Sequence, residues 1–236
     1  MLVPASIPNW FQGKDAIIDF VSIFVLVLVS YFSVKYYKIK KNKNNLSLTL
    51  AFSLLIASFT FKILITLGIY YNFLGMSHLG FGKLTISNFR SLDTFVFLMY
   101  FTYRIITLFG LYHLYRIYKP QSKSCFFLAS YLMVVSTFFA HYANFIFHLS
   151  AFVILLLITL HSIERYKKKK YPSTKLLIYS FGLITISQLF YTMMEIGMVY
   201  YIIAEFVQLF GYVGLLLTFI AVLIHGGKKN ETRYHW

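Results

Sequence analysis

The sequence predicts an all-α integral membrane protein with seven transmembrane helices, arranged as two three-helix repeats joined by a linker helix. Three observations predict this fold class. Charged residues make up only 12% of the 236 residues and hydrophobic residues 59%, whereas soluble domains contain about 25% charged residues. Apolar stretches long enough to cross a bilayer alternate with short polar loops. Two parts of the chain also resemble each other in sequence.

The individual helices follow from the length of each apolar stretch, because a membrane-spanning helix needs about 20 residues. The first stretch begins at Ala16 and has no signal-peptide cleavage site, so it is expected to remain as a span. The stretch 72–91 is rich in Gly, Ser and Asn and predicts a loop. A long uncharged stretch is divided at a turn near Asn144. The predicted helices are 16–34, 46–71, 92–115, 124–143, 145–163, 176–196 and 201–224, all within one membrane domain covering 1–236.

The distribution of Lys and Arg predicts the orientation in the cell membrane. Basic residues gather after the first, third, fifth and seventh predicted helices, for example in Arg-Tyr-Lys-Lys-Lys-Lys at 165–170. The positive-inside rule then places the N-terminus outside and the C-terminus in the cytoplasm. Much of the net charge of +15 would lie along the cytoplasmic surface, where anionic lipid headgroups attract it. Nucleic acid is not an expected partner.

An internal repeat is visible when the chain is shifted by 129 residues. Residues 33–71 then align with 162–200 without a gap, and 12 of the 39 positions are identical. Beyond the 72–91 loop the offset becomes 101, and Leu-Phe-Gly at 108–110 aligns with 209–211. The repeat units are expected at about 16–118 and 145–225, with 124–143 as the linker helix. Since equivalent helices run in the same direction, this is a parallel repeat, whose ligand sites tend to lie between the halves.

In architecture the chain resembles the three-plus-one-plus-three seven-helix proteins: SWEET sugar transporters, rhodopsin-like sensors and small seven-helix membrane proteins of archaeal genomes. The resemblance covers nearly the whole chain but brings no signature motif. SWEET members carry prolines within their helices, whereas the four prolines here lie outside the predicted spans. Rhodopsins attach retinal to a lysine in helix 7, and residues 201–224 contain none. The resemblance therefore implies an architecture and no covalent retinal.

Polar residues within the predicted spans are the candidate site. Arg104 and Glu205 occupy the same position in the two repeats, and opposite charges offset part of each other's cost of leaving water. We therefore expect Arg104 and Glu205 to approach each other between the repeats, either directly or through one water or ligand. By the same alignment Asp19 falls on His148, and Lys62 lies within about one turn of the counterpart of Glu195. The full set of candidates in the outer half of the bilayer is Arg104, Glu205, Lys62, Glu195, Asp19, His148, His141, Gln208 and Gln188.

These residues leave several alternatives open. The Arg104–Glu205 pair is either purely structural or part of a ligand site, and Asp19 or Lys62 alone could extend to the interface. His113 and His161 share a depth and could ligate a haem, although ordinary interfacial histidines are the simpler interpretation. One depth inconsistency remains. The third helix reaches a basic residue soon after Leu-Phe-Gly, so either the last helix projects into the cytoplasm or the matched glycines differ in depth.

The sequence favours a receptor- or sensor-like protein that binds a small ligand in an outward-facing polar pocket and acts through a partner membrane protein. The first alternative is a small-solute or proton-coupled transporter that works between the two repeats. The second is a structural membrane subunit without a ligand. No nucleophile–base arrangement, phosphate-binding loop or metal-ligand spacing is evident, so neither enzymatic activity nor a cofactor or metal is expected.

Overall fold

The computed structural model describes residues 11, 14–41, 43–70, 92–119 and 122–231, and these residues form an all-helical bundle of seven helices. This confirms the predicted helical class for the described part of the chain. The predicted loop at 72–91 lies outside the described residues. The helices are α1 (Lys14–Lys40), α2 (Lys43–Tyr70), α3 (Leu92–Tyr118), α4 (Lys123–Phe139), α5 (Phe145–Lys169), α6 (Pro172–Thr192) and α7 (Met198–Glu231).

Most helices extend beyond the apolar stretches from which they were predicted. Hydropathy indicates only the segment that suits lipid. The backbone hydrogen bonds of a helix can continue into polar sequence, and they do so readily here because lysine is a good helix former. The helix expected at 16–34 therefore runs to Lys40, and the one expected at 145–163 runs to Lys169. The sixth helix starts early, at Pro172, because proline suits the first position of a helix. It also ends four residues before the predicted end, at Thr192.

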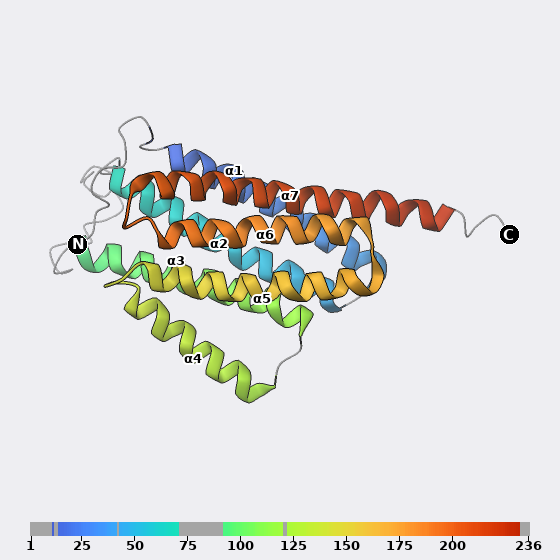
Figure 1. Cartoon of the computed structure of the whole chain (residues 1–236), viewed down its shortest axis with the longest axis horizontal. Helices are drawn as coiled ribbons and strands as arrows, with labels where there is room; N and C mark the ends of the chain where they lie inside the picture. The colour runs from blue at the N-terminus through green and yellow to red at the C-terminus, as the bar shows by residue number, and fades with distance from the viewer. Residues whose placement is uncertain (1–10, 12–13, 42, 71–91, 120–121, 232–236) are drawn as a thin grey trace, which may run out of the picture.

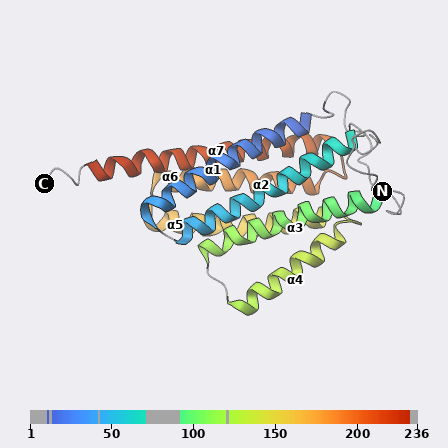
Figure 2. The ribbon, with the colours of Figure 1, turned by 180° about the vertical axis from the view of Figure 1, so that it is seen from behind.

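Six of the helices form a closed ring. Each triplet packs in chain order, α1 on α2 on α3 and α5 on α6 on α7, and contacts of α3 with α5 and of α7 with α1 close the ring. Figures 1 and 2 show these helices running roughly side by side along the long axis of the molecule. We call α1–α3 the first triplet and α5–α7 the second. Two helices that are opposite in this ring, such as α3 and α7, are not neighbours.

The fourth helix stands apart from the ring. Among the described helices, α4 packs only against α3 and α5, and it leans away from the bundle in both views (Figures 1 and 2). Only two of its residues, Met133 and Thr137, are buried. It carries the chain from the end of α3 back to the start of α5, which lie at opposite ends of the bundle (Figure 1).

The seventh helix is the longest. Its 34 residues correspond to about 51 Å at 1.5 Å per residue, well beyond the roughly 30 Å of a bilayer's hydrocarbon core. Figure 1 shows α7 continuing past the end of the other helices toward the C-terminus. Of the two explanations for the depth inconsistency in the sequence, the structure therefore agrees with a projecting last helix.

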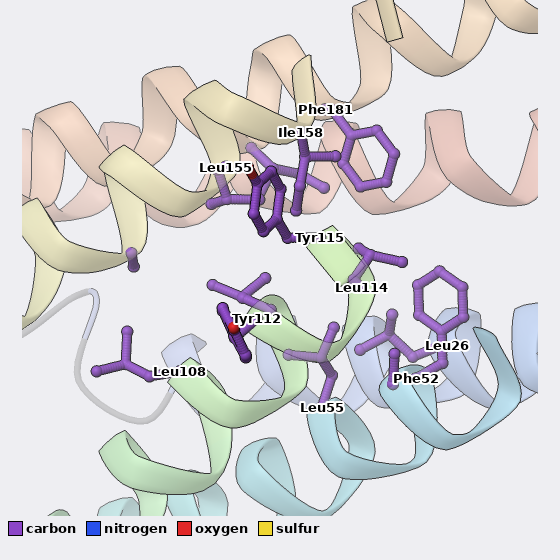
Figure 3. Close-up of a cluster of buried hydrophobic side chains, with 14 of the residues drawn as sticks. Leu26, Phe52, Leu55, Leu108, Tyr112, Leu114, Tyr115, Leu155, Ile158 and Phe181 are labelled. Carbon is purple, nitrogen blue, oxygen red and sulfur yellow. The ribbon is translucent and has the colours of Figure 1, made fainter. Parts of the chain in front are cut away.

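The buried core joins the two triplets. Every helix contributes to one cluster of buried side chains, and Figure 3 shows Leu108, Tyr112, Leu114 and Tyr115 of α3 extending between α1–α2 and α5–α6. Phe52 packs edge-on against Phe219 of α7, with ring centroids 6.0 Å apart. Burying a large apolar side chain stabilises a fold by about 1.5–3 kcal/mol in water, and close packing takes that role in lipid. This cluster therefore contributes much of the packing that holds the two triplets together.

The outer surface of the helices exposes many large apolar side chains. On α1 the exposed hydrophobic residues Ile17, Phe20, Phe24 and Tyr31 form one outward stripe, and such a surface suits lipid rather than water. Four helices are long and apolar enough to cross a membrane, over Lys14–Lys35, Leu46–Leu67, Phe145–Lys168 and Met198–Val222 of the described residues. The length and composition of these helices fit a membrane protein.

α1 and α5 end in the same way. Lys41 (φ 49°) and Lys170 (φ 43°) are the non-glycine residues with positive φ in the described chain. Each sits directly after a helix, and each amide N–H donates back to a tyrosine carbonyl four residues earlier: Lys41 to Tyr37 at 2.7 Å and Lys170 to Tyr166 at 2.8 Å. A left-handed residue at this position is a common helix C-terminus.

Two glycines allow neighbouring helices to approach closely. A Cβ atom on Gly110 of α3 would lie 3.2 Å from Leu55 of α2, and one on Gly211 of α7 would lie 2.4 Å from Ile184 of α6. The Gly211 Cβ would also lie 3.1 Å from the backbone oxygen of Ser180. Small residues at helix interfaces are typical of membrane bundles, where packing rather than hydrophobicity drives association.

Gly211→Ala should destabilise the protein by about 1–3 kcal/mol, because α6 and α7 must separate to admit the methyl group. Gly182→Ala is the matched control: it also lies within a helix, but its Cβ would meet nothing within 4 Å. The control should be neutral or slightly stabilising, since alanine favours helix over glycine. Thermal unfolding in detergent measures both, and equal melting temperatures for the two variants would contradict the close contact.

Candidate functional site

A buried ion-pair triad lies near one end of the bundle. The Lys62 Nζ atom of α2 lies 2.8 Å from Asp19 Oδ1 of α1 and 2.7 Å from Glu205 Oε1 of α7. Asp19 and Glu205 are each 1% exposed, and the Lys62 side chain is 14% exposed. We call Asp19, Lys62 and Glu205 the triad. It connects α1 and α2 of the first triplet to α7 of the second.

Charge pairing stabilises the triad in the buried interior of the bundle, where a single unpaired charge would cost free energy. An ionised side chain inside a membrane protein needs a partner, and charge-assisted hydrogen bonds are the strongest kind. The ammonium group of Lys62 donates to one oxygen of each carboxylate. The second oxygen of Asp19, Oδ2, is buried without a hydrogen-bond partner in the described chain. With both carboxylates ionised, two negative charges face one positive charge.

A second carboxylate of α1 lies beside the triad. Asp15 is 3% exposed; its Oδ1 accepts a hydrogen bond from the Ala16 amide at 2.9 Å, and its Oδ2 accepts one from the Tyr201 hydroxyl of α7 at 3.2 Å. Phe11 packs edge-on against the ring of Tyr201. Asp15 and Asp19 lie four residues apart and so on the same face of α1. This end of the α1–α7 contact is therefore acidic and covered by aromatic rings.

The predicted direct pair between Arg104 and Glu205 is wrong. Glu205 pairs with Lys62, whereas the Arg104 guanidinium donates to Asn144 Oδ1 at 2.5 Å and lies over the rings of Tyr100 and Phe147. The physical reason is the ring order: α3 and α7 lie on opposite sides of the ring, whereas α2 and α7 are separated only by α1. Residues on opposite helices of the ring meet only close to its centre.

Three other predicted residues gather at the centre. His148 Nδ1 lies 3.0 Å from Gln188 Oε1, and the His148 ring stacks on Tyr191 with centroids 4.7 Å apart. The Gln208 amide donates to the Tyr212 hydroxyl at 3.1 Å. All of these side chains line one central cavity of about 20 Å³, which is large enough for a single water molecule.

The remaining candidates lie elsewhere. Glu195 is exposed in the turn between α6 and α7, and His141 is exposed in the turn after α4. The His141 ring packs edge-on against Phe97, and both line a crevice of about 210 Å³ with Phe138 and Tyr142. The nine predicted residues thus divide into the triad, a central group of three, Arg104 in α3 with its guanidinium on Asn144, and two exposed residues.

The two histidines considered as haem ligands have separate surroundings. His161 Nδ1 lies 2.9 Å from the Leu157 carbonyl of its own helix, and its ring meets Tyr115 edge-on. His113 is half-buried on α3. The haem hypothesis stays a prediction. Within the described residues, no group of three or more His, Cys, Asp or Glu side chains is arranged to hold a metal ion.

Sequence reasoning missed several residues of the site, chiefly tyrosines. Tyr191 and Tyr201 are two of the 20 tyrosines of this chain, and tyrosines of membrane proteins commonly lie in an aromatic belt at the interface. Two signals in the sequence pointed to residues that were missed. Asp15 lies one helical turn before Asp19, and Tyr191 aligns with Lys62 at the offset of 129 residues. No family model, curated protein or solved structure matches this chain, so its own geometry carries the functional argument.

The ion pairs predict which substitutions interact. Lys62→Met should cost about 3–5 kcal/mol of stability, because two buried carboxylates lose their counter-charge. Adding Glu205→Met should recover part of that loss, with a coupling energy of about 0.5–3 kcal/mol. Arg104→Met and Glu205→Met share no partner and should add within about 0.5 kcal/mol. Unfolding of the two double-mutant cycles measures this.

Lys175→Met serves as the control for the loss of a lysine, because Lys175 is exposed on α6 and should change stability little. Strong coupling between Arg104 and Glu205, or equal effects of Lys62→Met and Lys175→Met, would contradict the triad.

Proposed function

We propose that the chain is a seven-span protein of the cell membrane, built from two parallel three-helix repeats with α4 as the linker, the N-terminus outside and the basic end facing anionic lipid in the cytoplasm. The packing order supports this proposal. Exchanging the two triplets maps α1, α2 and α3 onto α5, α6 and α7, and it maps the α3–α5 contact onto the α7–α1 contact. Helices that are in contact are thus mapped onto helices that are also in contact.

Local geometry at aligned positions supports the same repeat. The left-handed turn residues Lys41 and Lys170 are 129 residues apart. The close contact of Gly110 with Leu55 has its counterpart in that of Gly211 with Ile184. Both members of each contact are related by the offsets found in the sequence, 101 for the glycines and 129 for their neighbours.

The central cavity lies where the two repeats would meet. Its lining contains four aligned pairs, namely Leu55 with Ile184, Phe59 with Gln188, Thr107 with Gln208, and Leu111 with Tyr212. A site whose lining comes in such pairs lies on the axis that relates the repeats. In parallel-repeat transporters, binding sites and the relative motion of the halves both centre on this axis.

The function that this geometry supports best is proton-coupled transport of a small solute. The observation that carries it is the triad, because the Lys62–Glu205 pair crosses between the triplets while Lys62–Asp19 stays within the first. Any movement of one triplet against the other at this contact has to break the Lys62–Glu205 pair. The strength of that pair depends on the charge of Glu205.

A proton can therefore act as the switch. Protonating Glu205 removes its negative charge and with it the attraction between two opposite charges, which weakens the hydrogen bond from Lys62 and leaves Asp19 as the ionic partner of Lys62. The triad then carries one charge of each sign. Loss of the proton restores the pair between the triplets. Proton uptake and release would in this way be coupled to opening and closing of the α1–α7 contact.

The receptor hypothesis has one observation in its favour. The crevice of about 210 Å³ beside His141 lies between α3 and the end of α4, but it is smaller than the roughly 300–1,000 Å³ typical of small-molecule sites. A receptor of this kind would bind its ligand without flux and would act through a partner membrane protein. The two proposals therefore differ in turnover.

Proteoliposomes containing a trapped pH indicator test the transport proposal. With an inward proton gradient and a panel of sugars, amino acids, carboxylates and inorganic cations, the protein should admit protons in the presence of its solute. Glu205→Gln should abolish the flux because the switch can no longer be deprotonated. Glu164→Gln should not, since Glu164 is exposed at the other end of α5. Absence of proton flux with every member of the panel would favour the receptor.

The orientation is tested in intact cells after Cys125, the exposed native cysteine, is replaced by serine. A cysteine placed at Ser6 should react with a membrane-impermeant maleimide, and one placed at Ser173 should react only after permeabilisation. This follows from the Lys and Arg distribution. The reverse labelling pattern would overturn the orientation.

A further inference from the structure

The central cavity has a polar lining that the triad does not use. It is enclosed by residues of α2, α3, α5, α6 and α7 and has a volume of about 20 Å³. Tyr191, His148, Gln188, Gln208 and Tyr212 face it, and each is less than one-tenth exposed. A polar lining in the middle of a membrane bundle needs hydrogen-bond partners, because unsatisfied polar groups are costly there.

The hydrogen bonds around the cavity leave specific groups without a protein partner. The hydroxyl of Tyr191 is buried and has no partner among the described residues. The bond between His148 Nδ1 and Gln188 leaves His148 Nε2 available. The bond from Gln208 Nε2 to Tyr212 leaves the Gln208 carbonyl oxygen available. One donor and two acceptors are therefore present around a single small space.

We propose that this cavity is a binding site for one water molecule, held by Tyr191, His148 and Gln208. A water site requires about 10–15 Å³ and two to four polar partners, and the cavity meets both conditions. All five polar side chains are uncharged when His148 is neutral, so the lining matches a neutral hydrogen-bonding molecule.

The proposed water lies close to the acidic end of the α1–α7 contact. The Tyr191 ring contacts Tyr201 at 5.9 Å between centroids, and Tyr201 donates to Asp15 beside the triad. The water gives the Tyr191 hydroxyl the hydrogen-bond partner that the described residues do not supply.

Infrared spectroscopy of the purified protein detects the water directly. Exchange of the solvent from normal water into water labelled with oxygen-18 should shift an O–H band of an internal water in the wild type. Tyr191→Phe should remove or displace this band, because one of the three partners is lost. Ala151→Val should abolish it by filling the cavity, since Ala151 also lines this space.

Tyr112→Phe is the matched control. Tyr112 carries the other buried tyrosine hydroxyl that lacks a partner among the described residues, and it does not line this cavity. It should leave the band in place. A wild-type spectrum without an isotope-sensitive internal band, or a band unchanged in Ala151→Val, would overturn the water site.

Proton flux into proteoliposomes separates this inference from the proposed function. Absence of flux in the wild type would overturn the transport proposal, and the infrared band would still decide the water site. Flux in a wild-type protein that lacks the isotope-sensitive band would overturn the water site and leave the transport proposal standing.

Discussion

The pairing of Lys62 with two buried carboxylates is the constraint on which the arrangement of this bundle depends. A lone ammonium or carboxylate inside a membrane protein costs several kcal/mol, so Asp19, Lys62 and Glu205 can be buried only together. Meeting this condition brings α1, α2 and α7 to one point and fixes which face of each helix turns inward. The closure of the ring at the α1–α7 contact follows from it.

The positions aligned with the triad carry different chemistry. In the proposed repeat Asp19, Lys62 and Glu205 correspond to His148, Tyr191 and Arg104. His148 and Tyr191 stack on each other, and Arg104 extends to Asn144. One side of the bundle thus holds a bridged ion pair and the other side an aromatic pair beside a single guanidinium. Because the two sides differ, a movement of the triplets would not be controlled equally at both contacts.

Much of the fold was predictable because the length of a helix that suits lipid is visible in the sequence as an apolar stretch. Apolar length and the spacing of basic residues indicated helices in the order in which they occur, although the helix ends differ wherever a helix continues into polar sequence, as α7 does to Glu231. The choice of ion-pair partners was not predictable in the same way. Alignment of repeats shows which residues are equivalent, whereas contact depends on which helices are neighbours. Arg104 and Glu205 align in the sequence and sit on helices at opposite sides of the ring.

The isolated position of α4 has a consequence for the direction in which the second triplet runs. A unit of three helices starts at one end of the bundle and finishes at the other, so a second copy joined directly would run in the opposite direction. One additional helix restores the direction, and α4 makes this return while packing only against α3 and α5. In the proposed repeat α4 therefore acts as a spacer that sets the direction of the second triplet. Since only Met133 and Thr137 of α4 are buried, its length is constrained more strongly than the identity of most of its side chains.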